Sequence, residues 1–204
     1  SDYDEKLIPQ IAIVGKPNAG KSTLINSLAQ QDIAMVSEIP GTTRDTVNLN
    51  IEHKKKNYMF IDTAGLRRKS RVTEDVEYYS TSRAVDSIEK CDVVILIIDA
   101  QQGPTKQDLK IASLIKKNNK GIIVAVNKSD LIPQKLKNEA TIKKSLLSML
   151  TEINYALVVI VSALKFNNIS KIYSLIDKIY ESQKNKINTN SLNKFLKSLI
   201  LRST

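Results

Sequence analysis

The amino-acid sequence predicts an α/β protein with three layers, in which helices cover both faces of a mostly parallel sheet. Two observations carry this prediction. Short apolar runs such as DVVILII and GIIVAV are nearly continuous, as in strands that are buried on both faces of a parallel sheet. Longer stretches with apolar residues at helical spacing alternate with these runs.

Each element follows from a local pattern. Apolar runs predict six strands, at residues 10–14, 46–51, 58–61, 92–98, 121–126 and 157–161. Helical spacing predicts helices at residues 21–29, 105–117 and 169–182. The polar stretch HKKKN between the second and third strands predicts a hairpin, so we expect one antiparallel strand at the edge of the six-stranded sheet.

The composition limits the class of protein. The chain has 204 residues, which suits one domain or a domain with an appendage. A single cysteine excludes a disulfide framework within the chain and a cysteine-rich zinc site. The apolar runs fall far short of the roughly 20 residues of a membrane-spanning helix, and the polar, acidic start does not resemble a signal peptide. We therefore expect a soluble, cytoplasmic protein without a membrane partner.

A phosphate-binding pattern follows the first predicted strand. Residues 15–22 read GKPNAGKS and match G-x-x-x-x-G-K-[ST], directly before a predicted helix as the pattern requires. Glycines let backbone N–H groups approach a β-phosphate, and the helix N-terminus adds positive potential. Lys21 is expected to bind the β- and γ-phosphates, and the Ser22 hydroxyl to bind Mg²⁺.

Two further segments are expected to reach the γ-phosphate. Asp62 opens the segment D-T-A-G at the end of a predicted strand, where a carboxylate can hold Mg²⁺ through its second shell. Gly65 closes the segment and can turn its N–H toward a γ-phosphate. The stretch SEIPGTTRD at residues 37–45 holds two adjacent threonines, Thr42 and Thr43, and the chemistry alone leaves open which of them binds Mg²⁺.

A pattern for choosing the base follows the fifth predicted strand. Asn127, Lys128 and Asp130 belong to N-K-S-D, and the carboxylate can accept two hydrogen bonds from the N1–H and the amine of guanine. Adenine would leave that carboxylate unpaired, at a cost of about 1–3 kcal/mol or more. The segment S-A-L at residues 162–164 fits a loop that supports the base.

The order of these motifs resembles that of translation-factor-type GTPases. The stretches GKPNAGKST, PGTTRD and DTAGLRRKSRV are similar to the second GTPase domain of the Der or EngA family, which has two GTPase domains and acts in ribosome assembly. The tail TNSLNKFL resembles the segment that leads from that domain to the family's KH-like domain. The resemblance covers about residues 8–196 and implies a Ras-like P-loop GTPase fold.

The resemblance also implies residue roles that the chemistry left open. Thr43 matches the threonine that binds Mg²⁺ in this family. The expected catalytic residues are Lys21, Thr43 and Gly65. Asn18 matches the asparagine of GTPases activated by K⁺, whose ion is also held by carbonyls that correspond to Ser37, Ile39 and Thr42. Leu66 stands where Ras-like proteins have a glutamine that orients water, so hydrolysis by the isolated domain is expected to be slow. The expected nucleotide-binding residues are Gly15, Asn18, Ala19, Gly20, Lys21, Ser22, Thr23, Asp62, Thr63, Ala64, Gly65, Asn127, Lys128, Asp130, Ser162, Ala163 and Leu164.

The domain organisation follows from the same resemblance. The acidic residues 1–7 resemble a linker between domains, and residues 8–182 match the GTPase domain. The polar residues after 182 predict a linker and a short helix, up to residue 204, that lead to a KH-like domain. A first GTPase domain and the KH-like domain are thus expected to be missing from this chain. His53 is expected to be a solvated residue of the hairpin turn, and Cys91 a small packed one.

The resemblance implies an enzyme that hydrolyses GTP to GDP and phosphate, depends on Mg²⁺, is stimulated by K⁺, and acts with ribosomal RNA in assembly of the large ribosomal subunit. The alternatives are a nucleotide-gated module that binds the ribosome with little hydrolysis, or a GTPase similar to Era or MnmE that acts on other RNA. The net charge of +10 fits an RNA partner or simply solvated lysines. Residues 131–204 carry +8 of this charge, so nucleotide binding does not account for it.

Overall fold

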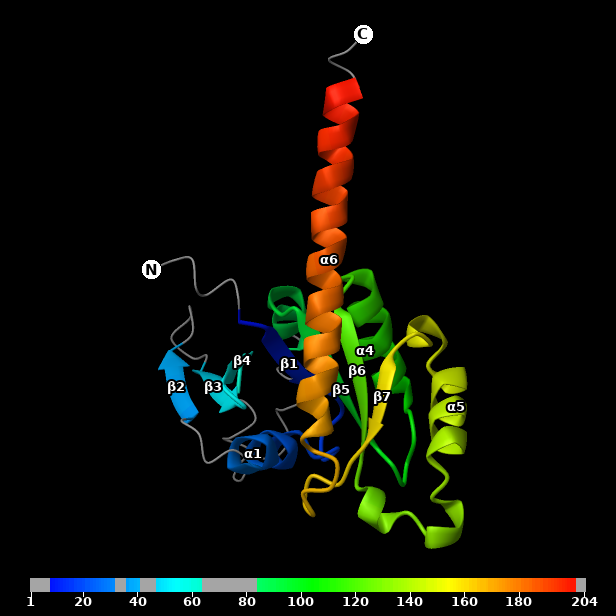
Figure 1. Cartoon of the computed structure of the whole chain (residues 1–204). Coiled ribbons are helices and arrows are strands. Elements are labelled where there is room, and N and C mark those ends of the chain that lie inside the picture. The colour runs from blue at the N-terminus through cyan, green and yellow to red at the C-terminus, as the bar shows by residue number, and fades with distance from the viewer. Residues whose placement is uncertain (1–7, 32–35, 41–46, 64–83, 201–204) are drawn as a thin grey trace.

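A computed structural model describes residues 8–31, 36–40, 47–63 and 84–200 (Figure 1). Its sheet has seven strands in the order β2-β3-β4-β1-β5-β6-β7. The strands are β1 Gln10–Val14, β2 Val36–Pro40, β3 Val47–His53, β4 Lys56–Phe60, β5 Val93–Asp99, β6 Gly121–Asn127 and β7 Leu157–Ile160. The α-helices with full bounds are α1 Lys21–Gln31, α4 Lys106–Lys117, α5 Glu139–Met149 and α6 Lys171–Ile200, and residues 84–90 are also helical. Short 3₁₀ helices are η2 Ser129–Leu131, η3 Gln134–Leu136 and η4 Thr151–Ile153.

The strand directions confirm a mostly parallel sheet. Strands β4, β1, β5, β6 and β7 run parallel, while β3 runs antiparallel to β4 and to β2. The structure adds β2 beyond β3, where no strand was predicted, so the sheet has seven strands rather than six. Its five residues, VSEIP, lack a run of apolar residues, and pairing of Val36–Pro40 with β3 defines this strand. Because β2 is an edge strand, Pro40 can lie at its end without removing a bond from the interior of the sheet.

Two apolar cores confirm the three-layer arrangement. On one face of the sheet, Leu24 and Leu28 of α1 join Ile172 and Ile176 of α6 in a single buried cluster. On the other face, the buried cluster combines residues from segment 84–90, α4 and α5 with the opposite side of β5 and β6. Every residue of β5 is buried, as expected for a central parallel strand covered on both faces. Figure 1 shows the helices divided in this way around the sheet.

The helix α5 was not predicted. Its sequence, EATIKKSLLSM, has only a weak apolar period, and Leu146 is the one residue of α5 that is buried. Its start is set by capping instead, since the Asn138 side chain accepts a hydrogen bond from the N–H of Thr141 at 3.0 Å.

Helix α6 is one continuous helix, whereas the sequence predicts a helix that ends at residue 182, followed by a linker and a second, short helix. It continues without a break through residues 183–190 to Ile200. The polar residues of QKNKINTN are tolerated in a helix, and the sequence between Lys171 and Ile200 contains neither glycine nor proline to end it. Figure 1 shows its C-terminal half projecting well past the sheet.

Aromatic contacts fix the first half of α6 against the β3–β4 hairpin. The His53 ring stacks on Tyr173 of α6, with 4.1 Å between ring centroids and 9° between planes. His53 is buried, so its predicted place as a solvated loop residue was wrong, because the final residue of β3 points into the core rather than into the turn. The Tyr173 hydroxyl donates to the carbonyl of Leu28 in α1 at 3.1 Å. Cys91 is buried, as predicted.

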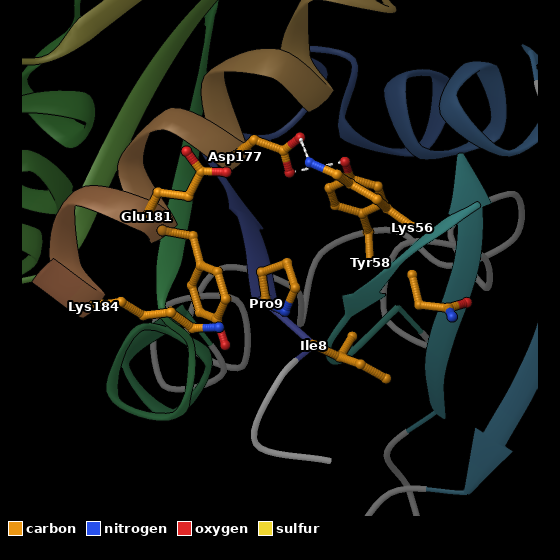
Figure 2. A pocket seen from close by; sticks show the side chains of 9 residues that line it. Ile8, Pro9, Lys56, Tyr58, Asp177, Glu181 and Lys184 are labelled. Atoms are coloured by element: carbon orange, nitrogen blue, oxygen red, sulfur yellow. Dashed lines mark hydrogen bonds and ion pairs between the residues drawn. The ribbon is translucent and has the colours of Figure 1, made fainter. Parts of the chain in front are cut away.

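A cleft of about 310 Å³ lies beside this contact, at the start of β1 and β4 (Figure 2). On its wall, Asp177 of α6 accepts a hydrogen bond from the Tyr58 hydroxyl at 2.9 Å and pairs with the Lys56 amine at 2.6 Å. Lys184 lies over the ring of Tyr180, with its amine 4.5 Å from the ring centroid. Within the described part of the chain, no helix is both long and apolar enough to span a membrane.

Candidate functional site

The predicted motif segments meet at one edge of the sheet. The residues after β1, β4, β6 and β7 carry the four motifs, and these strands run parallel. Their carboxyl ends therefore lie at the same edge, which is where ligands bind in open α/β sheets. The cleft of Figure 2 lies at the opposite edge, where β1 and β4 begin.

The loop between β1 and α1 depends on two glycines. Gly15 has a φ of +149° and Gly20 a φ of +106°, which are conformations that other residues rarely adopt. A Cβ atom at Gly15 would come within 2.5 Å of the Ile97 carbonyl, and one at Gly20 would overlap the side-chain amide of Asn127. The loop therefore lies directly against β5 and β6, and its path requires glycine at both positions.

Lys21 closes this loop. Its amine donates to the carbonyls of Gly15 and Lys16, both at 2.7 Å. Lys21 is also the first residue of α1, so the free N–H groups of the helix start face the loop. A cation and a helix N-terminus together form an arrangement suited to phosphate. Asn18, at the outer turn of the loop, is exposed and has a φ of +62°.

Asn127 joins two of the motif segments. It is buried, and its amide donates to the Ala19 carbonyl at 3.0 Å while its oxygen accepts from the N–H of Ala163 at 3.0 Å. Ser27 of α1 adds a second link, with its hydroxyl donating to the Ala163 carbonyl at 2.6 Å. Asn127 therefore holds the phosphate loop and the S-A-L segment together as one unit, although Ala19 and Ala163 are 144 residues apart in the sequence.

Asp130 stands at the surface beside this unit. The Ser162 hydroxyl donates to Asp130 Oδ1 at 2.5 Å, and the Ser162 oxygen accepts from the N–H of Lys165 at 3.2 Å. Asp130 itself is exposed, whereas Ser162 and Ala163 are buried and Leu164 is 69% exposed. A carboxylate fixed through one oxygen and open to solvent can accept hydrogen bonds from a ligand that presents two N–H groups.

Lys128 pairs with a carboxylate that the sequence analysis missed. Lys128 has a left-handed backbone, with a φ of +66°, and its amine lies 2.6 Å from Oδ2 of Asp99, the last residue of β5. Asp99 Oδ1 accepts a hydrogen bond from the N–H of Gln101 at 2.8 Å. An aspartate that ends an otherwise apolar strand at the ligand-binding edge is the signal that could have revealed it.

The environment of Asp99 keeps it charged. The side chain is 2% exposed, and this burial by itself raises the pKa of the carboxyl. The hydrogen bonds from Lys128 and from the backbone of Gln101, with the charges of Lys128 and Lys16, outweigh burial and lower the pKa below its ordinary value. Lys16 also contacts the turn after β5, since its amine donates to Gln102 at 2.5 Å.

Asp62 and Thr63 lie at the same edge, next to the phosphate-loop strand. The N–H of Asp62, whose φ is +52°, donates to Asn48 Oδ1 at 3.1 Å, and Ser87 lies 3.4 Å from its carboxylate. Thr63 is buried and donates through its hydroxyl to the Val47 carbonyl at 2.8 Å. Among the described residues, no group of three or more His, Cys, Asp or Glu could hold a metal ion by itself.

Several predicted residues lie outside the described ranges. They are Thr42, Thr43, Ala64, Gly65 and Leu66. Ser37 and Ile39 belong to β2, where they pair in register with Asn50 and Asn48 of β3. The structure brings the other predicted residues, from Gly15–Thr23, Asp62–Thr63, Asn127–Asp130 and Ser162–Leu164, to one edge of the sheet.

This fold and this edge define the class of P-loop guanine-nucleotide-binding proteins. The comparisons with known proteins agree, since the family described as 50S ribosome-binding GTPase matches residues 10–128. The chain belongs to this family. By family it is therefore a GTPase domain.

Two similar curated proteins are both named GTPase Der. The protein from Agathobacter rectalis is 46% identical over 95% of this chain and 44% of its own length. The protein from Fusobacterium nucleatum is 44% identical over 98% of this chain and 46% of its own length. The chain thus spans about half the length of the curated relatives it matches, as expected for one GTPase domain of the Der or EngA family.

A solved structure of Era confirms the fold class. Era in complex with MgGDPNP and nucleotides 1506–1542 of 16S ribosomal RNA is 31% identical, with a TM-score of 0.63 over 84% of this chain and 56% of that chain. Era from Aquifex aeolicus bound to GDP·AlF4⁻ is 30% identical, with a TM-score of 0.62. Both are proteins to which this chain is similar.

Proposed function

We propose that this chain is a nucleotide-controlled switch domain whose GTP hydrolysis requires Mg²⁺, is stimulated by K⁺ and serves assembly of the large ribosomal subunit. The observation that carries the proposal is the unit built around Asn127. One buried side chain fixes the phosphate loop to the S-A-L segment, with Lys128 and Asp130 beside it. A phosphate site and a base site are thereby held at a fixed distance.

The phosphate site is assigned to the loop of residues 15–20 and to the start of α1. Gly15, Asn18, Ala19 and Gly20 supply backbone N–H groups to the α- and β-phosphates. In the described structure the Lys21 amine binds loop carbonyls, and we expect it to move to the β- and γ-phosphates when nucleotide is bound. Ser22 and Thr23 complete the first turn of the helix there.

The base site is assigned to Lys128, Asp130 and the S-A-L segment. Asp130 accepts two hydrogen bonds from guanine, while Ser162 holds the carboxylate in place. Lys128 covers the base through its alkyl chain, with its amine anchored by Asp99. An adenine would leave the carboxylate without its donors, so we expect discrimination against ATP.

The described residues fit a magnesium ion. The Ser22 hydroxyl stands at the first turn of α1, and Asp62 lies two residues after β4, the strand next to β1, at the same edge. With phosphate oxygens and Thr43, this is the hard oxygen set that Mg²⁺ prefers. When bound, Mg²⁺ neutralises charge on the β- and γ-phosphates. Asp62 would orient a water ligand of the ion, and Ser22 would fix the ion against the helix.

For K⁺, the described residues offer one side chain. Asn18 is exposed at the turn of the loop and carries an amide oxygen that can bind the ion. The backbone carbonyls of Ser37, Ile39 and Thr42 would complete the site. Because carbonyls alternate along a strand, those of Ser37 and Ile39 in β2 point to the same side and can act together. A cation there would stabilise the charge that develops during hydrolysis.

The test of this function is GTP turnover by the chain in KCl and in NaCl at equal ionic strength. We expect faster turnover in KCl, and turnover of ATP well below that of GTP. Equal rates in both salts would remove the K⁺ assignment, and equal rates with ATP would remove the base assignment. Loss of turnover with EDTA, restored by MgCl₂, tests the need for Mg²⁺.

The ribosomal role needs a separate test. Binding of the chain to isolated large ribosomal subunits is compared with a non-hydrolysable GTP analogue, with GDP and without nucleotide. We expect the strongest binding with the GTP analogue. Identical binding in all three states would exclude nucleotide-controlled action on the subunit.

A further inference from the structure

We propose that the outer face of α4 and α5 binds the phosphate backbone of ribosomal RNA through lysine side chains. This face, called the lysine face below, consists of Lys106, Lys110 and Lys117 of α4 and Lys144 of α5, with Lys135 of η3 and Lys137 in the segment that leads into α5. All six side chains are exposed. The inference rests on the proposed ribosomal function for the source of the RNA, and it adds the surface that makes the contact.

The charge of the chain is concentrated in this part of the molecule. Between residues 106 and 153 there are ten lysines and four acidic residues, a surplus of +6 in a chain whose total is +10. None of these positive residues is an arginine. A surplus this local gives one side of the protein a positive field, which attracts and steers a polyanion.

Within the described part of the chain, the lysine face also has no ion-pair partners. Three other lysines of the same segment are in ion pairs, Lys116 with Glu152, Lys128 with Asp99 and Lys143 with Glu139. For the six members of the face, no ion pair with a carboxylate of the described residues is present. These amines are therefore available to external phosphates.

The packing of α4 and α5 places the four members on these helices on one side of the sheet. Ala112 and Ile115 of α4 and Leu146 of α5 enter the same apolar core, so both helices cover the same face of the sheet. Lys106, Lys110 and Lys117 follow each other at helical spacing of four and seven residues, opposite this buried side. They form a stripe about 16 Å long. The ion pair between Lys116 and Glu152 ties the end of α4 to η4, directly after α5.

The composition of the face favours a nucleic acid over an acidic protein. Lysine is depleted in protein–protein interfaces because its strongly hydrated amine is costly to bury. Nucleic-acid interfaces are polar, wet and rich in positive charge, so an amine can bind phosphate and keep much of its water. Lysine contacts of this kind position an RNA without reading its bases.

The experiment compares two triple variants of this chain with equal charge change. The first is Lys106→Gln, Lys110→Gln and Lys117→Gln on the α4 stripe. The control is Lys90→Gln, Lys171→Gln and Lys178→Gln, which removes three exposed lysines outside the face. The probe is purified large-subunit ribosomal RNA, with affinity measured between about 50 and 200 mM salt, the range in which phosphate contacts change affinity most visibly.

We expect the first variant to bind this RNA roughly 20- to 100-fold more weakly and to reduce the slope of log K against log salt by about 2. The control should stay within about threefold of the parent chain, which would be a loss of less than 1 kcal/mol. Equal losses in both variants would show a general charge effect and overturn the proposal, as would no loss in either. Competition by polyglutamate as effective as that by RNA would assign the face to an acidic protein instead.

GTP turnover is measured in the same preparations, because the lysine face lies outside the nucleotide edge. Both variants should keep the parent rate without RNA, and equal circular dichroism spectra would show that they are folded. A parent chain without GTP turnover would refute the proposed function but leave the RNA result readable. Normal GTP turnover together with unchanged RNA binding in the first triple variant would refute RNA binding by the lysine face and leave the proposed function standing.

Discussion

Replacing Asp99 by asparagine tests how the base site is organised. The variant Asp99→Asn keeps the shape of the side chain and an oxygen that can accept the N–H of Gln101. It removes the negative charge that holds the Lys128 amine at 2.6 Å. Lys128 would then lose its anchor next to the proposed guanine position, without any change in residues that touch the nucleotide.

The magnitude follows from burial. A hydrogen bond to a charged group contributes about 1.5–3 kcal/mol, and the lower end applies here because the Lys128 side chain is 32% exposed to water. We therefore expect GDP and GTP to bind about tenfold more weakly, which corresponds to about 1.4 kcal/mol. KM for GTP should rise by the same factor with kcat nearly unchanged, since the lost contact is equal in the ground state and the transition state.

The pH dependence has a defined sign. The pKa of Asp99 is lowered in the folded protein, so its stabilising effect is complete above the ordinary aspartate pKa of about 3.8 and is lost as pH falls through the lower folded value. Between pH 5 and 9 the difference between parent and variant should therefore stay constant.

The assay is titration of labelled GDP into the parent chain, Asp99→Asn, Lys128→Met and the double variant. If Asp99 acts through Lys128, adding Asp99→Asn to Lys128→Met should cause no further loss of affinity. An equal tenfold loss in both backgrounds would refute this reasoning. So would a single Asp99→Asn variant that is less stable to urea yet binds GDP like the parent.

Four further predictions concern other parts of the structure. Gly20→Ala should abolish GDP binding by calorimetry, because the new Cβ overlaps the amide of Asn127 at a positive φ, whereas Gly103→Ala, with nothing within 4 Å, should bind normally. Asp130→Asn should move nucleotide preference from guanine toward xanthine in a competition assay, and unchanged preference would argue against the base site. Asp177→Ala should lower the free energy of unfolding in urea by about 1 kcal/mol through loss of the partly buried Tyr58 hydrogen bond, with GTP turnover unchanged. The Cys91 thiol, whose pKa burial raises to about 12, should resist iodoacetamide at pH 8 until the chain is unfolded, and rapid native-state labelling would contradict this.

The central strands were predictable because each carries its own signal. Strands β1, β5, β6 and β7 are apolar over nearly their whole length, since both faces of a parallel sheet are buried. Strand β2 and helix α5 have no such signal: the first is defined by pairing with β3 and the second by its Asn138 cap. Local periodicity does not record either kind of stabilisation.

In the candidate site too, residues with a local sequence signal were predicted, and residues that depend on distant contacts were missed. Gly15, Gly20 and Asn127 were predicted from motifs because each has a backbone or packing requirement that few residue types meet. Asp99 was missed because its importance depends on a contact with Lys128, which is 29 residues away in the sequence. His53 was misjudged for a related reason, since its burial involves stacking on Tyr173 of α6, which is distant in sequence.

Helix α6 has the mechanical properties of a lever arm. Tyr173 and Asp177 fix its first half to α1 and to the β3–β4 hairpin, and the helix continues for about 20 Å or more beyond Gln183, whose amide bonds the Asp92 carbonyl. The hairpin leads directly into Asp62 and Thr63 at the nucleotide edge. A rotation of about 10° at these contacts would therefore displace the far end of the helix by roughly 4 Å.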